Sequence, residues 1–303
     1  MKEKKIYHNI GVLAHVDSGK TTLTEQLLYL TGAVREAGSV DKGNAVTDNL
    51  DIERRRGISV RTSTASAEWN GVNINLIDTP GHTDFAGEVE RSLTALDYAI
   101  VIVSAVEGVR AHTENILRAL DDLKLPRLVF VNKLDRAGSD TSAVIRDLGS
   151  RGGRAYFPVV SWEGEGYESV KVKSLGGEEF DEKLLEALAE VNDEAAEAFL
   201  GDEKIPHERL CEMMKAEISA CGLVPVLCGS AKLGLGVREL CDFMTEYMPS
   251  SDRRATDELC GIIFKIEHDK QMGKISYVRL FGGKITNRDE IKLLRPIDEK
   301  RKN

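Results

Sequence analysis

Eight residues near the start of the chain, Ala14–Thr21 (AHVDSGKT), restrict its possible folds more than any other segment. They match the phosphate-binding loop pattern G-x-x-x-x-G-K-S/T, except that Ala14 stands in place of the first glycine. The loop follows a short uncharged apolar run, residues 9–14, and precedes a segment with helical spacing, residues 22–30. A buried strand that leads through such a loop into a helix indicates an α/β domain with a parallel sheet.

The chemistry of this loop gives its residues definite roles. Backbone N–H groups from Asp17 to Thr21, with the helix N-terminus, would surround the β- and γ-phosphates of a nucleotide. Lys20 would add a positive charge, and the Thr21 hydroxyl would coordinate Mg²⁺. The loop alone distinguishes neither ATP from GTP nor a kinase from a switch. The loop residues expected at the nucleotide are His15, Val16, Asp17, Ser18, Gly19, Lys20, Thr21 and Thr22.

A second motif, Asn132–Asp135 (NKLD), follows an apolar run and selects the base. The Asp135 carboxylate can accept hydrogen bonds from N1–H and the exocyclic amino group of guanine, whereas adenine offers no such pair of donors. Asn132 would brace the loop, and the stem of Lys133 would cover the base. A complementary backbone donor for the guanine carbonyl is expected from Gly229, Ser230 and Ala231. The sequence therefore predicts a GTP site.

A third motif, Asp78–Gly81 (DTPG), also ends a strand-like run and is followed directly by His82. Asp78 stands where a water-mediated Mg²⁺ ligand belongs, and the Gly81 N–H can approach the γ-phosphate closely. We expect His82 to orient the attacking water, with Lys20 and Gly81 completing the catalytic set. Each motif follows a strand, and open α/β sheets bind ligands at the carboxyl ends of their strands.

The rest of the chain divides into an α/β part and a β-rich part. Apolar runs at 72–77, 98–103, 127–131 and 224–228 alternate with helical spacing at 113–123 and 237–247, which indicates a doubly wound sheet. We expect a GTP-binding domain over residues 1–252, with a helical and irregular insertion at about 151–221. Strand patterns over 257–303, including one around 291–294, predict the beginning of a β-barrel domain. These few strands cannot close a barrel, so we expect that domain to be truncated.

Composition narrows the class of protein further. The net charge of −9 argues against a chain that binds polyanions as a whole, so no DNA partner is expected. The cysteines are odd in number and form no C-x-x-C pair, which favours reduced, mostly buried thiols. No apolar run is long enough for a signal peptide or a membrane span. We expect a cytoplasmic monomer.

These motifs, with Arg56–Ser59 (RGIS), resemble the GTPase module of translational GTPases of the elongation factor G type. Within that class, Gly38–Gly43 (GSVDKG), Thr22–Glu25 (TLTE) and Glu258–Gly261 (ELCG) look most like the tetracycline-resistance ribosomal protection proteins. The resemblance covers essentially the whole chain and is weakest in the insertion. It also accounts for Ala14, because that class tolerates alanine there.

The resemblance implies further roles. Residues from about 40 to 61 would form the first switch and residues from 78 to about 90 the second. Ser59 stands where the family usually has a threonine that serves Mg²⁺. Val16 and Ile58 match an apolar pair beside the catalytic histidine, although ordinary packing explains them equally well. Asp17 matches a residue linked to a monovalent cation, and Arg54–Arg56 (RRR) could contact ribosomal RNA.

The function implied by the resemblance is a ribosome-dependent GTPase that protects the ribosome from tetracycline. No motif arginine serves as an arginine finger, so the free protein should hydrolyse GTP slowly and the ribosome should stimulate it. A housekeeping translocase or release-type factor with the same GTPase remains open. A regulatory GTP sensor without hydrolysis is a third possibility, against which Thr21, Asp78 and His82 argue. An ATP-dependent kinase or motor conflicts with Asn132–Asp135.

Overall fold

The computed structural model describes residues 6–36, 38, 63–78, 92–151, 153–250, 258–269 and 271–292. Ser59, Gly81 and His82 lie outside the described residues, as do both predicted switch segments apart from Asp78. The first half of the described chain contains β1 (Ile6–Ala14), α1 (Lys20–Leu30), β2 (Ser63–Trp69), β3 (Val72–Asp78), β4 (Tyr98–Ser104), α4 (Ala111–Asp122), β5 (Arg127–Asn132) and α5 (Thr141–Ser150). The second half contains β6 (Ala155–Pro158), β7 (Val160–Glu163), β8 (Lys171–Ser174), α6 (Gly177–Ala189), α7 (Asp193–Leu200), α8 (His207–Ser219), β9 (Leu223–Cys228), the short 3-10 helix η2 (Ala231–Leu233), α9 (Val237–Tyr247), β10 (Cys260–Asp269) and β11 (Gly273–Gly282).

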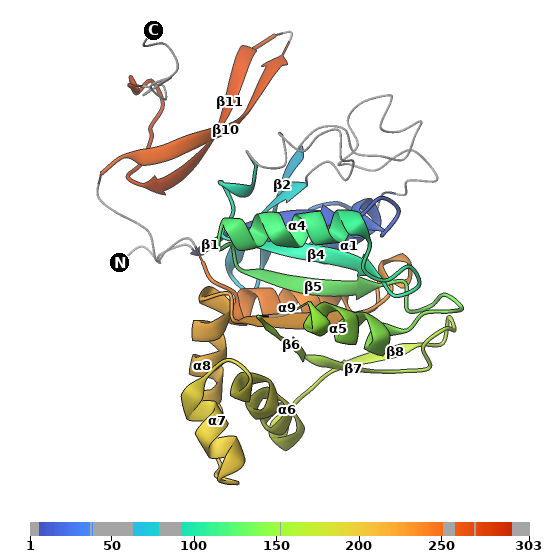
Figure 1. The fold of residues 1–303 in the computed structure, drawn as a ribbon. Helices are drawn as coiled ribbons and strands as arrows, with labels where there is room; N and C mark the ends of the chain where they lie inside the picture. Colours follow the sequence, from blue (N-terminus) through green and yellow to red (C-terminus); the bar gives the residue numbers. More distant parts are fainter. Residues whose placement is uncertain are drawn as a thin grey trace, which may run out of the picture.

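A seven-stranded sheet forms the centre of the molecule, in the order β2-β3-β1-β4-β5-β9-β6. Neighbouring strands run parallel except for the antiparallel pair β2 and β3. Every residue of β4, β5 and β9 is buried, which explains their continuous apolar sequences. Helices α4 and α5 cover one face of the sheet, while α1 and α9 pack together on the other (Figure 1). The predicted α/β fold is confirmed.

The register of the sheet brings the predicted motifs to one edge. Val12 of β1 lies opposite Asp78 at the end of β3, and Ser104 of β4 lies opposite Asn132 at the end of β5. Because these parallel strands point the same way, the carboxyl ends of β1, β3, β5 and β9 lie at one edge of the sheet.

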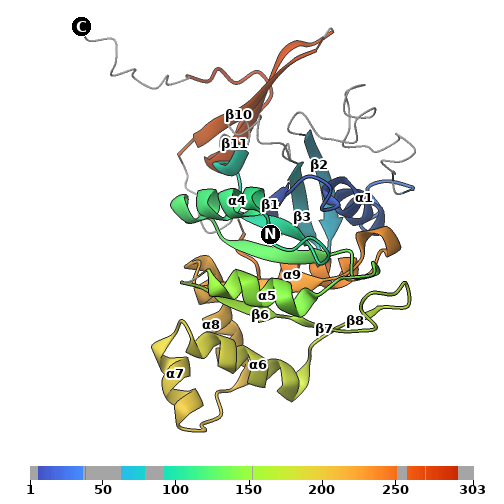
Figure 2. The ribbon, with the colours of Figure 1, turned by 45° about the vertical axis from the view of Figure 1, so that its right-hand side comes forward.

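The helical insertion departs from the sheet later than the sequence indicated. We expected it to begin at about residue 151, but β6 belongs to the main sheet and pairs in parallel with β9. A strand of only four residues that ends in Pro158 is too short to give a clear periodic pattern. Beyond it, β7 and β8 form a separate antiparallel pair, and α6, α7 and α8 pack together (Figure 2). Leu184, Leu188 and Met214 of these helices are buried in the same apolar cluster as the sheet.

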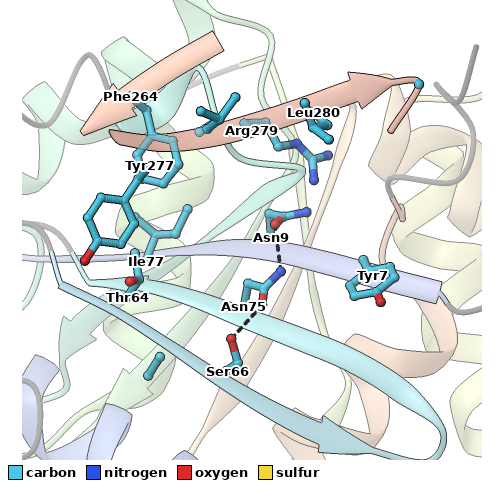
Figure 3. Close-up of a pocket in the computed structure, with 14 residues that line it drawn as sticks. Tyr7, Asn9, Thr64, Ser66, Asn75, Ile77, Phe264, Tyr277, Arg279 and Leu280 are labelled. Carbon is cyan, nitrogen blue, oxygen red and sulfur yellow. Dashed lines mark hydrogen bonds between the residues drawn. The ribbon is translucent and has the colours of Figure 1, made fainter. Parts of the chain in front are cut away.

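The β-rich end of the described chain is an antiparallel hairpin, β10 and β11. A pocket of about 520 Å³ lies between the hairpin and the β1–β3–β2 side of the sheet. Figure 3 shows Phe264, Tyr277 and Arg279 of the hairpin on one side of this pocket and Asn9 and Asn75 of the sheet on the other. The strand predicted around 291–294 is not seen at residues 291 and 292, and its other residues lie outside the described part.

The cysteines are less buried than the sequence indicated. Only Cys228 and Cys241 are buried, while Cys211 and Cys221 are partly exposed and Cys260 is exposed. The thiols are therefore not mostly buried, because Cys260 lies on the open hairpin and Cys221 in a turn after α8. Among the described residues, no helix is both long and apolar enough to cross a membrane.

Candidate nucleotide-binding site

The phosphate loop connects β1 to α1 through two residues in the left-handed region. Asp17 has φ 63° and Gly19 has φ 93°. A Cβ atom on Gly19 would lie 2.3 Å from Nδ2 of Asn132, so only glycine fits there without displacing a neighbour. The Ser18 N–H donates to the His15 carbonyl at 3.1 Å and tightens the turn. Lys20 and Thr21 follow in the first turn of α1, and both are buried.

Lys20 and Asp78 form a buried ion pair at this edge, with Nζ and Oδ1 2.6 Å apart. Asp78 is 1% exposed, and it is the last residue of β3. Thr21 directly follows Lys20 in α1 and carries a hydroxyl. A carboxylate and a hydroxyl are hard oxygen donors, the type that Mg²⁺ prefers, so the residues present fit a magnesium site.

Asn132 ties the phosphate loop to the loop after β9. Its Nδ2 donates to the Ser18 carbonyl at 2.8 Å, and its Oδ1 accepts from the Ala231 N–H at 2.9 Å. The residue is 3% exposed. A single side chain, through one donated and one accepted hydrogen bond, therefore fixes two predicted nucleotide loops relative to each other.

The backbone donors predicted for the guanine carbonyl already have acceptors. The Gly229 N–H donates to Val131 O at 2.9 Å, and the Ser230 N–H donates to Leu235 O at 3.2 Å. The Ala231 N–H donates to Asn132. A base bound at this position would share one of these donors or draw it away from its present acceptor.

Lys133 is held across the site by Glu107, a residue that the motifs did not indicate. Its Nζ lies 2.8 Å from Oε1 of Glu107, in the segment between β4 and α4. Partial burial works to raise the pKa of Glu107, but the hydrogen bond from Lys133 and the nearby positive charges outweigh it and lower the pKa. The position of Glu107, shortly after the buried strand β4, was the one signal that could have identified it.

The remaining predicted residues also lie at this edge. Asp17 is exposed, whereas Val16, Thr22 and Asp135 are half-buried. The His15 ring is 5.9 Å from the ring of His112, and Nδ1 of His15 is buried with no hydrogen-bond partner among the described residues. The described members of the predicted set are thus brought together, while Ser59, Gly81 and His82 lie outside the described residues.

Comparison with known proteins identifies relatives over most of the chain. Residues 5–250 match the family model of the elongation factor Tu GTP-binding domain. The chain is 40% identical over 295 residues to tetracycline resistance protein TetP of Clostridium perfringens, covering 96% of this chain and 44% of the relative. It is 34% identical over 330 residues to elongation factor G 1 of Treponema denticola, covering 93% of this chain and 48% of that protein.

A solved structure agrees with the fold. The crystal structure of ttk003000868 from Thermus thermophilus superimposes with a TM-score of 0.81 at 32% identity. The match covers 92% of this chain and 46% of that protein. The chain therefore spans less than half the length of these similar proteins.

Proposed function

Because the chain belongs to the elongation factor Tu GTP-binding domain family, we propose that it binds GTP with Mg²⁺ and hydrolyses it to GDP and phosphate. The observation that supports this most strongly is the convergence of the predicted motifs. Lys20 and Asp78 are in contact, and Asn132 joins the phosphate loop to the loop after β9. A nucleotide placed at this edge would meet the phosphate-binding and base-reading residues together.

On the phosphate side, the N–H groups of Asp17 to Thr21 and the Lys20 ammonium bind the β- and γ-phosphates. Thr21, Ser59 and Asp78 would hold Mg²⁺, which would supply positive charge to neutralise the phosphate oxygens. The Gly81 N–H contacts the γ-phosphate, and His82 orients the attacking water. His15, Val16 and Thr22 line the same loop, and Asp17 is the proposed neighbour of a monovalent cation.

On the base side, the Asp135 carboxylate accepts from N1–H and the amino group of guanine. The stem of Lys133, held at its end by Glu107, covers the base. The Ala231 N–H, which now donates to Asn132, supplies the donor for the guanine carbonyl. Replacing guanine by adenine would leave the Asp135 carboxylate without its two donors.

At the level of the whole protein, we propose a ribosome-associated translation factor that acts in the cytoplasm as a monomer and protects the ribosome from tetracycline. The names of TetP and of the equally similar TetM of Enterococcus faecalis, 40% identical over 285 residues, support this assignment. We further propose that residues 1–252 form the GTP-binding domain and that residues 257–303 begin a second domain.

Nucleotide binding and turnover test these proposals together. We expect fluorescent GDP to bind and to be displaced by GTP but not by ATP, and we expect ribosomes to stimulate phosphate release. His82→Ala should retain GDP binding and lose most of the stimulated turnover. Equal displacement by ATP would refute the base assignment, and unchanged turnover in His82→Ala would refute the catalytic role.

A further inference from the structure

The loop between β7 and β8 of the insertion contacts the segment that carries Asp135 at two places. Glu165 and Gly166, adjacent in this loop, bind Thr141 and Leu134, and Asp135 lies between those two partners in sequence. In Figure 1 the β7–β8 pair lies on the side of the sheet toward which β5 points. The insertion, whose role is otherwise unassigned, therefore reaches the predicted base-reading loop.

The Glu165 carboxylate holds the start of α5. Its Oε1 accepts from the Thr141 N–H at 2.8 Å and from the Thr141 hydroxyl at 2.6 Å, and its Oε2 accepts from the indole N–H of Trp162 at 3.1 Å. Thr141 is completely buried. A carboxylate that accepts from the first N–H of a helix is favoured by charge and by the helix dipole, so this contact is a strong one.

Gly166 holds the other side of Asp135. Its N–H donates to the Leu134 carbonyl at 2.8 Å, while the Leu134 N–H donates to the Gly229 carbonyl at 3.2 Å. The backbone of Leu134 is thereby fixed between the insertion and the loop after β9. Gly166 has φ 91°, a conformation that L side chains rarely adopt, so glycine lets the loop present its N–H in this direction.

We propose that Glu165 is a positioning residue for guanine recognition: through Thr141, and with its neighbour Gly166 on Leu134, it fixes the backbone on both sides of Asp135. This inference rests on the proposed GTP site. The carboxylate of Asp135 can meet the N1–H and amino group of guanine together only if its backbone is held in one place. The insertion then contributes to base selectivity although it supplies no residue that touches the base.

The test compares GDP with inosine diphosphate, which lacks only the exocyclic amino group of guanine. The dissociation constant of inosine diphosphate divided by that of GDP reports how well the Asp135 carboxylate meets that group. In Glu165→Ala we expect GDP affinity to fall about tenfold and the ratio to fall about fivefold, because a displaced carboxylate loses its preference. The affinities for GDP and for GTP should fall by the same factor, because the substitution does not affect the γ-phosphate side of the site.

Matched variants separate positioning from general stability. Glu163 is an exposed residue of the β7–β8 pair, and Glu163→Ala should leave both affinities and the ratio unchanged. Glu165→Gln keeps an oxygen that can accept from Thr141 and should restore most of the ratio. Thr141→Val removes one of the two Thr141 donors at nearly constant volume, and it should lower the ratio by about twofold even if Glu165→Ala fails to fold.

The outcomes are distinct. If the unaltered chain shows no preference for GDP over inosine diphosphate, the proposed GTP site fails and this inference fails with it. If the unaltered chain prefers GDP while the ratio stays unchanged in Glu165→Ala, or in Thr141→Val where Glu165→Ala does not fold, the inference alone is overturned. In that case a lower melting temperature would show that Glu165 only stabilises the fold.

Discussion

At the scale of single residues, Asn132 joins two loops of the candidate site through one side chain. Asn132→Ala would leave the Ser18 carbonyl without this partner in a buried place, and it would remove the side chain that joins the phosphate loop to the loop after β9. Unpaired buried polar groups cost about 1–3 kcal/mol each. We expect GDP affinity to fall by about tenfold or more, as measured by displacement of fluorescent GDP.

Asn132→Asp is the informative companion variant. It keeps an oxygen for the Ala231 N–H but turns a second oxygen toward the Ser18 carbonyl, so it should bind GDP no better than Asn132→Ala. Wild-type affinity in Asn132→Asp would show that the bond to Ser18 is dispensable.

His8 carries a prediction about pH. It is 2% exposed, and its Nδ1 lies 3.1 Å from the Tyr98 hydroxyl. Burial lowers the pKa of His8 from its ordinary value of 6.5, although the charge of Asp97 works to raise it. As pH falls, His8 therefore takes up a proton in the unfolded chain at a higher pH than in the folded chain. The stability that neutral His8 provides is complete above pH 6.5 and is lost as pH falls through the lowered pKa.

The measurement is urea unfolding between about pH 7.5 and about pH 5.5. His8→Gln removes the titrating group, so the variant should lose less stability over this range than the unaltered chain. An identical pH dependence in both would show that His8 does not couple to folding.

The residues of the motifs could be located from sequence because each follows a recognisable apolar strand. Their partners could not. Glu107 and Glu165 act through contacts between segments far apart in the chain, and nothing in their neighbouring residues indicates Lys133 or Thr141 as a partner. The bonds of Ala231 were also unpredictable, because the sequence does not indicate which donors the fold already uses.

At the scale of elements, a buried ion pair joins β11 to the sheet. Nη2 of Arg279 lies 2.6 Å from Oδ1 of Asp97, and the two side chains are 8% and 3% exposed. Oδ2 of Asp97 accepts from the backbone N–H of Asn9 at 2.8 Å and from its Nδ2 at 2.9 Å. The network thus connects the hairpin to β1, the strand that leads into the phosphate loop.

Arg279→Met would leave Asp97 buried without its cation, which typically costs about 3 kcal/mol. Adding Asp97→Asn should recover part of that loss, because the uncompensated charge is gone. Urea unfolding followed by tryptophan fluorescence gives the free energies of the single and double variants. A loss below about 1 kcal/mol in Arg279→Met would mean that the hairpin detaches and water solvates Asp97.

The sequence predicted the elements unevenly for a physical reason. Strands β4, β5 and β9 are buried on both faces and appear as continuous apolar runs, so their positions were predictable. The strand β6 is short, and it joins the sheet only because β9, more than sixty residues later, provides its partner. That pairing depends on tertiary contact, which local periodicity does not report.

At the scale of the whole molecule, the apolar core runs without a break from the sheet into the insertion. Phe180 lies 5.4 Å from Phe157 of β6, measured between ring centroids, and Met214 and Ile218 of α8 are buried in the same cluster as the sheet. The hairpin differs, because Arg279 and Gly282 are the only buried residues of β10 and β11. The sheet and the insertion should therefore unfold together, whereas the hairpin can open separately.

Hydrogen exchange with and without GDP tests this division. A ligand that binds only the folded state at about 100 times its dissociation constant adds about 2.7 kcal/mol to the free energy of global unfolding. Amides that exchange only through global unfolding should slow by about a hundredfold, in α6 and α8 as well as in β4 and β5. Amides of β10 and β11 should slow much less, because their local opening does not release the nucleotide.

If α8 amides exchange at the same rate with and without GDP, the insertion opens independently of the sheet.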